Sequence, residues 1–123
     1  MASVLFADDD PDIRALASQL LARRGHHALT AGDGTEAITL LTEFIPDMVI
    51  TDLNMPQQDG CAVCRAVRES PRLSHIPLVL ITALPEDDLR VLQAVSESRA
   101  IVIAKTDIVR LPDLADRLVS SAA

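Results

Sequence analysis

Five short apolar runs recur along the chain and alternate with longer segments in which apolar and polar residues mix. The runs cover residues 4–7, 28–31, 48–51, 78–81 and 101–104. Their length suits strands, and their alternation with helix-length segments is typical of strand–helix–strand units. The runs at 78–81 and 101–104 have no polar gap, which indicates strands covered on both faces, as in a parallel sheet between helices. The pattern predicts an α/β fold with five strands and five helices.

Cap signals and apolar spacing place the five helices. Asp10 followed by Pro11, and Asp33 followed three residues later by Glu36, are typical of helix N-termini, and Asp59-Gly60 opens the third helix. Apolar residues three and four apart predict the side of each helix that faces the core. These core positions are Ile13, Leu16, Ala17, Leu20 and Leu21 in the first helix, Ala37, Leu40 and Leu41 in the second, Val63 and Val67 in the third, Leu89, Leu92 and Val95 in the fourth, and Leu114, Leu118 and Val119 in the fifth.

Length, charge and hydropathy narrow the class of protein. With 123 residues, 49% of them hydrophobic, we expect one domain over residues 1–123 with its own core. The net charge is −7 and the eleven Lys and Arg residues are scattered. This argues against direct nucleic-acid binding and suits partners with basic faces, or bound cations. The apolar runs are far shorter than the roughly 20 residues that span a bilayer, so we expect a soluble, cytoplasmic protein without membrane contact.

The cysteines and histidines offer little chemistry. Cys61 and Cys64 are three residues apart, a spacing that resembles half of a zinc site or a redox pair. A structural zinc site needs four ligands and the chain has no second Cys pair, so we favour a packing role on one helix face. His26, His27 and His75 have no metal-ligand spacing with the carboxylates, and we expect them at the surface or at strand edges.

Polar side chains follow the predicted strands at the ends where parallel α/β sheets bind ligands. Asp8 and Asp9 follow the first strand, Asp52 the third, Thr82 the fourth and Lys105 the fifth. We therefore expect these five residues to converge on one shallow pocket. Clustered carboxylates repel one another unless a cation neutralises them, and oxygen-only ligands suit Mg²⁺. The pattern predicts a Mg²⁺ site at Asp9 and Asp52, with Asp8 acting through a bound water.

A carboxylate beside Mg²⁺ can attack phosphorus and form an aspartyl phosphate. We expect Asp52 to be that nucleophile and Lys105 to supply an ammonium that stabilises charge on the transferred oxygens. The Thr82 hydroxyl can donate to a phosphoryl oxygen, so its rotamer would report the modification. Taken singly, each of these residues is common as a cap, turn or solvated charge. Their joint occurrence at strand ends favours a site.

These residues resemble the receiver domains of two-component response regulators, over essentially the entire chain. The similarity lies in the acidic opening Asp8-Asp9-Asp10-Pro11-Asp12-Ile13-Arg14, the segment from Pro46 to Gly60, the pair Thr82-Ala83, and Lys105. The resemblance implies a flavodoxin-like three-layer fold with strand order 2-1-3-4-5. It also implies that Asp52 is the phosphoacceptor, that Asp8 and Asp9 organise Mg²⁺, and that Asn54 contributes its backbone carbonyl to the metal.

By the same resemblance, the chain would be the phosphoacceptor module of a two-component phosphorelay. It would take a phosphoryl group from a phosphohistidine on a histidine kinase or a histidine phosphotransfer protein. Phosphorylation would change its contacts with a downstream protein that the sequence does not identify. It would catalyse only its own phosphorylation and dephosphorylation, and would not be an enzyme with other substrates.

The chain departs from the family pattern at two positions near Lys105. The family usually has Pro after this lysine, with a cis peptide bond, whereas here Thr106 follows. A cis bond before Thr costs about 3 to 4 kcal/mol, so we expect a trans bond. The family also usually has an aromatic residue at position 102, where this chain has Val102. Without a ring at position 102, the coupling that the family usually has between its aromatic residue and Thr82 cannot operate in the same way.

Two alternatives to phosphorelay signalling remain at this point. The departures at Val102 and Thr106 suggest a receiver-like protein-binding module that signals without phosphorylation. A phosphohydrolase of the haloacid-dehalogenase type would also use an aspartyl phosphate and Mg²⁺. Asp8-x-Asp10 fits the nucleophile pattern of that family, but the chain is too short for its cap and later motifs.

Leu84, two residues after Thr82, flanks the expected path of attacking water, and we expect this apolar side chain to slow hydrolysis of the aspartyl phosphate.

Overall fold

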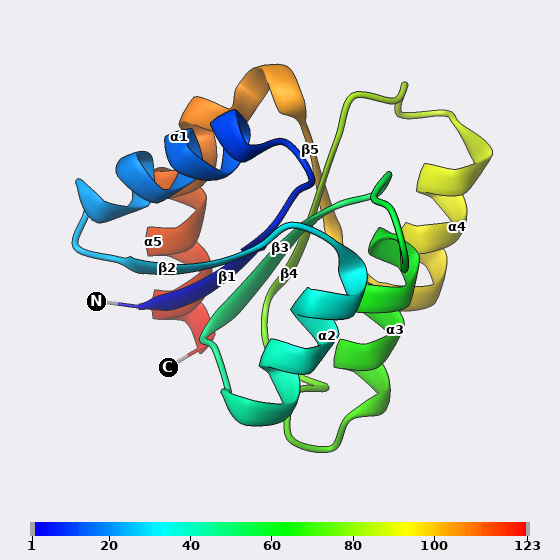
Figure 1. The fold of residues 1–123 in the computed structure, drawn as a ribbon, viewed down its shortest axis with the longest axis horizontal. Helices are drawn as coiled ribbons and strands as arrows, with labels where there is room; N and C mark the ends of the chain where they lie inside the picture. The colour runs from blue at the N-terminus through cyan, green and yellow to red at the C-terminus, as the bar shows by residue number, and fades with distance from the viewer. Residues whose placement is uncertain (1, 123) are drawn as a thin grey trace.

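The five strands form one parallel sheet with the order β2-β1-β3-β4-β5 (Figure 1). A computed structural model describes residues 2–122, with the side chains of residues 2–119. The strands are β1 (Ser3–Ala7), β2 (His27–Ala31), β3 (Met48–Asp52), β4 (Leu78–Thr82) and β5 (Ile101–Ala104). The helices are α1 (Pro11–Ala22), α2 (Gly34–Glu43), α3 (Gly60–Glu69), α4 (Leu89–Ser98) and α5 (Leu111–Ala122), and a 3₁₀ helix, η1 (Lys105–Arg110), links β5 to α5. The flavodoxin-like fold with order 2-1-3-4-5 is confirmed.

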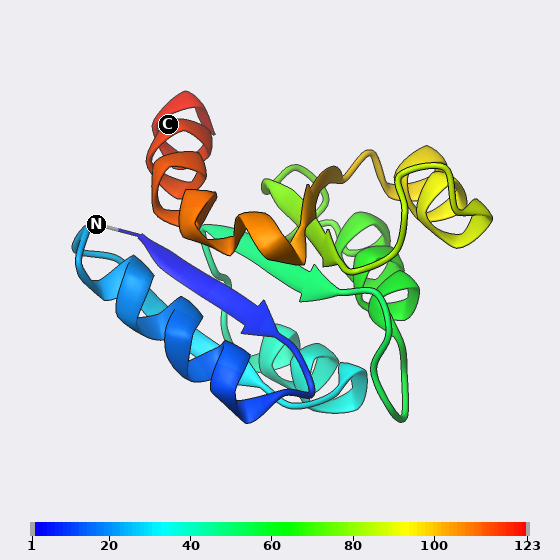
Figure 2. The same ribbon diagram turned by 90° about the horizontal axis from the view of Figure 1, so that it is seen from above.

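Helices cover both faces of the sheet, which gives three layers (Figures 1 and 2). Alternate residues of β1 separate the two apolar cores: Val4 and Phe6 pack with α1 and α5, and Leu5 and Ala7 with α2, α3 and α4. All residues of β3 and β4 are buried. Central strands that are covered on both faces explain the continuous apolar runs in the sequence.

Acidic caps begin the helices, as the sequence predicts for α1, α2 and α3. Asp10 accepts a hydrogen bond from the Asp12 N–H at 2.9 Å, and Asp33 accepts one from the Glu36 N–H at 2.7 Å. Asp59 caps α3 through the Ala62 N–H at 3.0 Å. Because the helix N-termini follow the carboxyl ends of the strands, these caps also concentrate negative charge on the edge of the sheet that carries the predicted site.

The predicted core side of α4 is wrong for its two leucines. Leu89 is 80% exposed and Leu92 is 51% exposed, whereas Val91, Ala94 and Ser98 are buried. The buried side of this helix is formed by these smaller residues and packs with α3. Val95 is partly buried against the core, as predicted. In α1, Leu16 is 39% exposed, while Ala17 and Leu21 are buried. The predicted core side of α1 therefore wrongly included Leu16.

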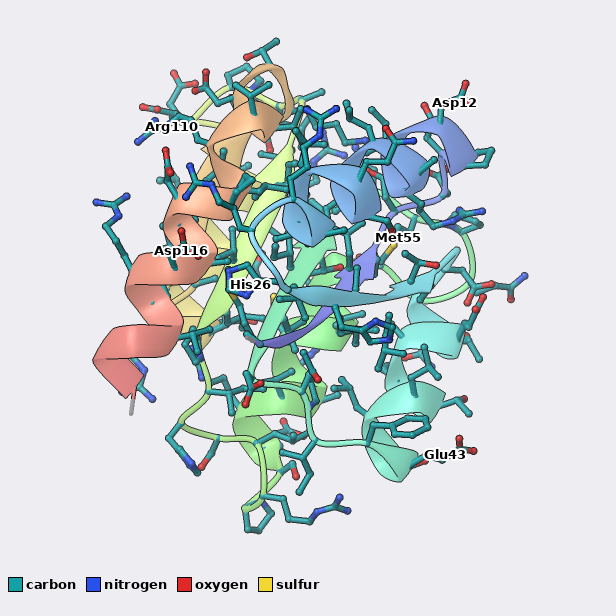
Figure 3. All side chains as sticks on the ribbon, turned by 90° about the vertical axis from the view of Figure 1, so that its left-hand side faces the viewer. Asp12, His26, Glu43, Met55, Arg110 and Asp116 are labelled. Atoms are coloured by element: carbon teal, nitrogen blue, oxygen red, sulfur yellow. The ribbon has the colours of Figure 1, made fainter. Side chains whose placement is uncertain are left out.

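His26 is buried just before the edge strand β2, so of its two expected positions the surface one is wrong. Its Nδ1 accepts a hydrogen bond from the Ala2 N–H at 3.2 Å, and its Nε2 lies 2.6 Å from Asp116 Oδ1 (Figure 3). Nδ1 acts as an acceptor here, so Nε2 carries the proton that bonds Asp116. Arg24 also pairs with Asp116, at 2.6 Å. His26 therefore joins the start of β1 to α5.

Two further expectations can be compared with the backbone. No cis peptide bond occurs among the described residues, so the Lys105–Thr106 bond is trans, as expected from the missing proline. Within residues 2–122, no helix has both the length and the apolar character needed to cross a bilayer.

Candidate functional site

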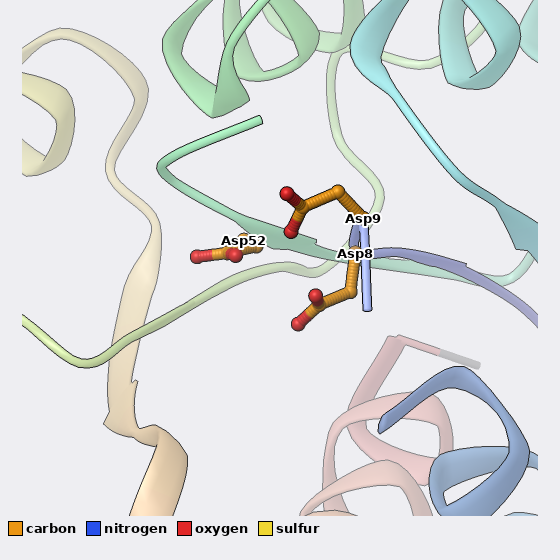
Figure 4. A group of neighbouring side chains, drawn as sticks. All are labelled: Asp8, Asp9 and Asp52. Carbon is orange, nitrogen blue, oxygen red and sulfur yellow. The ribbon is translucent and has the colours of Figure 1, made fainter. Parts of the chain in front are cut away.

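The carboxyl ends of β1, β3, β4 and β5 bring the predicted site residues to one edge of the sheet. Asp8 directly follows β1, Asp52 and Thr82 are the last residues of β3 and β4, and Lys105 directly follows β5. β1 pairs with β3, and β3 with β4, so these ends are spatial neighbours. Figure 4 shows Asp8, Asp9 and Asp52 gathered there. One oxygen from each of the three carboxylates lies within 4.8 Å of the others.

Lys105 bridges two of these carboxylates. Its Nζ lies 2.8 Å from Asp52 Oδ2 and 3.0 Å from Asp8 Oδ2. Asp8 and Asp52 are both buried, and Asp9 is exposed. The buried part of the site thus holds two carboxylates and one ammonium, which leaves an excess of negative charge.

This charge distribution shifts the pKa values of two groups. Burial raises the pKa of the Asp52 carboxyl above its usual value, and the neighbouring Asp8 adds to the rise, although the hydrogen bond from Lys105 opposes it. Burial lowers the pKa of the Lys105 ammonium, but the hydrogen bonds and charges of Asp52 and Asp8 outweigh this, so the net shift is upward. Asp52 is therefore a carboxylate whose charge is poorly stabilised, beside a lysine held in its charged form.

The residues present fit a hard divalent cation. Asp8 Oδ2 is buried, and its charge partner is the Lys105 ammonium at 3.0 Å, which it shares with Asp52. One ammonium does not neutralise two buried carboxylates, which is costly, and a divalent cation would supply the missing positive charge. The three carboxylates offer oxygen only, which suits Mg²⁺ rather than a soft metal. The acidic cluster can therefore hold a metal ion.

Backbone contacts fix the orientation of Asp8. Its Oδ1 accepts a hydrogen bond from the Asp10 N–H at 2.9 Å. The Arg14 guanidinium, one turn into α1, donates to the Asp8 carbonyl at 2.7 Å. Arg14 belongs to the sequence segment that carries the family resemblance, but sequence reasoning assigned it no role. Only the folded geometry shows that it secures the loop next to the carboxylate.

Thr82 lies at the site, but its hydroxyl bonds to its own loop. Its Oγ1 accepts a hydrogen bond from the Leu84 N–H at 3.0 Å. Its hydrogen therefore remains available for donation to an oxygen within the site. Val102 packs partly buried against the core shared with α2, α3 and α4. A valine has no ring to move behind Thr82, which agrees with the departure noted in the sequence.

The loop of residues 53–59 connects β3 to α3 and carries Asn54, which is exposed. The Asn54 N–H approaches Asp52 Oδ1 at 3.4 Å, a long hydrogen bond. The Gly60 N–H donates to the Leu53 carbonyl at 2.8 Å and closes the loop. A Cβ on Gly60 would lie 2.7 Å from Leu53 Cα, so only glycine allows α3 to begin this close to the strand that carries Asp52.

The two cysteines lie on α3. Cys64 is buried, and burial raises the pKa of its thiol to about 11. Burial also raises the pKa of the Cys61 thiol, with the Asp59 charge adding to the rise. Thiols with raised pKa values are poor nucleophiles at neutral pH. This favours the packing role over a redox pair.

The sequence matches the family described as the response regulator receiver domain over residues 4–114. The chain belongs to this family. It is therefore a signalling domain of the kind found in two-component response regulators, and not a classical enzyme. Among curated relatives, it is 38% identical over 87 residues to the transcriptional regulatory protein AfsQ1 of Streptomyces coelicolor, and 39% identical over 84 residues to the response regulator PleD of Caulobacter vibrioides.

Solved receiver domains share this fold. The signal receiver domain of a signal transduction histidine kinase from Syntrophus aciditrophicus superposes with a TM-score of 0.88 at 31% identity, covering 98% of this chain and 92% of that one. The chemotaxis protein CheY4 of Vibrio cholerae superposes with a TM-score of 0.85 at 28% identity, covering 96% and 98%. The curated relatives are longer. The matches cover 71% and 68% of this chain, but only 37% of AfsQ1 and 18% of PleD.

Proposed function

We propose that this domain accepts a phosphoryl group on Asp52 from a phosphohistidine of a partner protein, in a reaction that requires Mg²⁺. The observation that carries the proposal is the buried cluster of Asp8, Asp52 and Lys105. It places an acceptor carboxylate 2.8 Å from an ammonium, next to a second buried carboxylate that shares the same ammonium at 3.0 Å. Membership of the receiver domain family supports this use of the cluster.

The proposed transfer is a displacement at phosphorus. A carboxylate oxygen of Asp52 forms a bond to phosphorus while the bond from phosphorus to the donor imidazole nitrogen breaks. The electron pair of the broken bond stays on the imidazole, which takes up a proton. The Lys105 ammonium would stabilise the negative charge on one transferred oxygen, and the Thr82 hydroxyl can donate its free hydrogen to another. Each of these residues stabilises charge that increases as the donor leaves.

Asp8, Asp9 and Asp52 would hold the Mg²⁺, together with the backbone carbonyl of Asn54. When bound, the ion would neutralise charge on the phosphoryl oxygens and so lower the barrier to attack by a carboxylate. It would also compensate the excess negative charge of the two buried carboxylates, Asp8 and Asp52. The metal site and the phosphorylation site therefore share Asp52.

The partner would be a histidine kinase or a histidine phosphotransfer protein, as is general for receiver domains. The net charge of −7 and the acidic caps around the site favour a partner whose docking face is basic. The readout would be a change in protein contacts near Thr82 and the loop that begins at Leu84. That loop is tied to the Thr82 hydroxyl, whereas position 102 has no ring to respond.

Beryllofluoride, which mimics a phosphoryl group on a carboxylate, tests this proposal. With Mg²⁺ present, we expect shifts of backbone amide resonances at Asp52, Thr82 and Leu84. Asp52→Asn should abolish them, because an amide offers no anionic oxygen. A wild-type spectrum that does not change would contradict the proposal.

A second candidate function rests on Val102 and Thr106: a protein-binding module that works without phosphorylation. It would use the same fold but would need neither Mg²⁺ nor an acceptor at position 52. A partner that binds wild type and Asp52→Asn equally, with and without beryllofluoride, would favour this candidate over the phosphoacceptor.

A further inference from the structure

The loop of residues 53–59, which carries Asn54, is held by few hydrogen bonds. Its ends are fixed: Gly60 N–H bonds the Leu53 carbonyl at 2.8 Å, and Asp59 caps α3. Between them, residues 55–58 form no hydrogen bond within the described part of the chain. Gln57 also adopts a left-handed conformation with φ 68°, which a residue with a side chain tolerates poorly. Packing must therefore keep this loop in shape.

The first residue of α2 supplies such a contact. Gly34 is buried against the backbone of Gln58: a Cβ on Gly34 would lie 2.5 Å from the Gln58 carbonyl carbon and 2.9 Å from the Gln58 Cβ. Both distances are far shorter than van der Waals contact. Because the obstacle is mainly backbone, no rotamer change could relieve the clash. A side chain at position 34 would have to displace the loop.

Backbone conformation does not explain this glycine. Among the described glycines only Gly25 has a positive φ, so any L-residue could adopt the conformation of Gly34. Helix propensity also disfavours glycine relative to nearly every other residue. What remains is the close approach of two backbones, which only glycine permits. Position 34 therefore requires a residue without a side chain, because the loop of residues 53–59 occupies the space that a side chain would need.

The start of α2 is a firm support for the loop. The Asp33 carboxylate accepts from the Glu36 N–H at 2.7 Å, and the Glu36 carboxylate accepts from the Gly32 N–H at 3.2 Å. Just before this turn, the Ala31 carbonyl accepts from the Asp8 N–H at 3.0 Å. The turn that begins α2 and contacts the loop of residues 53–59 is thus held by its own hydrogen bonds and by the bond between Ala31 and Asp8.

We infer that Gly34 is a positioning residue for the metal site, acting through its contact with Gln58 on the loop that carries Asn54. This rests on the proposed function, in which the Asn54 carbonyl is a Mg²⁺ ligand. A methyl group at position 34 would push the loop away from α2 and turn that carbonyl off the metal. Changes to residues that orient metal ligands commonly weaken binding by one to two orders of magnitude.

The test is the Mg²⁺ affinity of Gly34→Ala, measured by amide chemical shifts during titration. We expect binding about tenfold weaker than in wild type, while the phosphorylation rate at saturating Mg²⁺ returns close to the wild-type rate. Thr35→Ala is the matched control. It changes the next residue of α2, whose side chain is exposed, and its affinity should stay within about twofold.

The outcomes separate this inference from the proposed function. Wild type that binds Mg²⁺, with Gly34→Ala binding equally well, would overturn the role of Gly34 and leave the proposed function standing. Wild type without Mg²⁺ binding would overturn both. If Gly34→Ala does not fold, the coupling is tested in the wild-type protein. There the Gly34 and Gln58 amide resonances should both shift along one Mg²⁺ titration curve. A Gly34 resonance that stays fixed while Gln58 moves would refute the coupling.

Discussion

Replacing Asp52 with Asn should stabilise the metal-free domain, although it removes an ion pair. Burial and the nearby Asp8 raise the pKa of Asp52, so folding favours its neutral form. A raised pKa in the folded state means that stability is fully present below the unfolded pKa and is lost as the pH rises through the folded value. At neutral pH the carboxylate therefore destabilises the fold, and a neutral amide of the same shape should not.

The geometry gives the size of the effect. The Asp8 and Asp52 oxygens lie within 4.8 Å of each other, which corresponds to a repulsion of about 3 kcal/mol at an effective dielectric constant near 20. The amide escapes this repulsion and the cost of burying a charge, but gives up the attraction to Lys105, about 6 kcal/mol at 2.8 Å and the same dielectric constant. Because burial and the repulsion together outweigh that attraction in raising the pKa of Asp52, we expect a small net gain, on the order of 1 kcal/mol. With roughly 2 cal/mol/K of unfolding entropy per residue, that gain raises the melting temperature of a chain of this length by about 4 °C.

Circular dichroism is a suitable assay, because the chain has no Trp or Tyr for intrinsic fluorescence. Melting is measured without Mg²⁺ at several pH values, with Asp9→Asn as the control for an exposed carboxylate. The gain of Asp52→Asn should shrink as the pH falls toward the usual carboxyl pKa. A melting temperature below that of wild type at neutral pH would refute the reasoning, because the attraction to Lys105 would then outweigh burial and repulsion.

Three further changes test other parts of the structure. Arg68 donates to three backbone carbonyls, those of Ser98, Ser74 and Ile76. Arg68→Lys should therefore cost about 2 to 3 kcal/mol in urea unfolding, and a loss below about 0.5 kcal/mol would show that water replaces these bonds. Gln57→Gly should stabilise by about 0.5 kcal/mol because it relieves a left-handed conformation; clear destabilisation would contradict this. Leu84→Glu should speed the decay of phosphorylated protein by ordering the attacking water, and an unchanged or slower decay would sink that idea.

The sequence predicted the sheet well because its signals are local and strong. The apolar runs correspond to β1 to β5 with shifts of one residue at most, and Asp10, Asp33 and Asp59 are the caps that begin α1, α2 and α3. Family resemblance then supplied the strand order. The gathering of Asp8, Asp52 and Lys105 follows from that order, since parallel strands end at one edge of the sheet.

What the sequence could not predict depends on distances between elements. Leu89 and Leu92 have helical spacing but face solvent, while the smaller residues Ala94 and Ser98 lie on the buried side of α4. His26 is buried by partners from residues 2 and 116, which no local pattern connects. The contact of Gly34 with Gln58 joins the start of α2 to the loop after β3, and their relative position exists only in the fold. These contacts depend on how the elements pack against one another, and the apolar periodicity along the chain does not predict that packing.

The most direct test of the central claim is whether Asp52 becomes phosphorylated. Wild-type protein, incubated with Mg²⁺ and acetyl phosphate, is analysed by intact mass and by reductive trapping of the acyl phosphate followed by peptide mapping. The account predicts the mass gain of one phosphoryl group, located at Asp52, dependent on Mg²⁺ and absent from Asp52→Asn. No gain in the folded wild-type protein, or a gain that persists in Asp52→Asn, would contradict it.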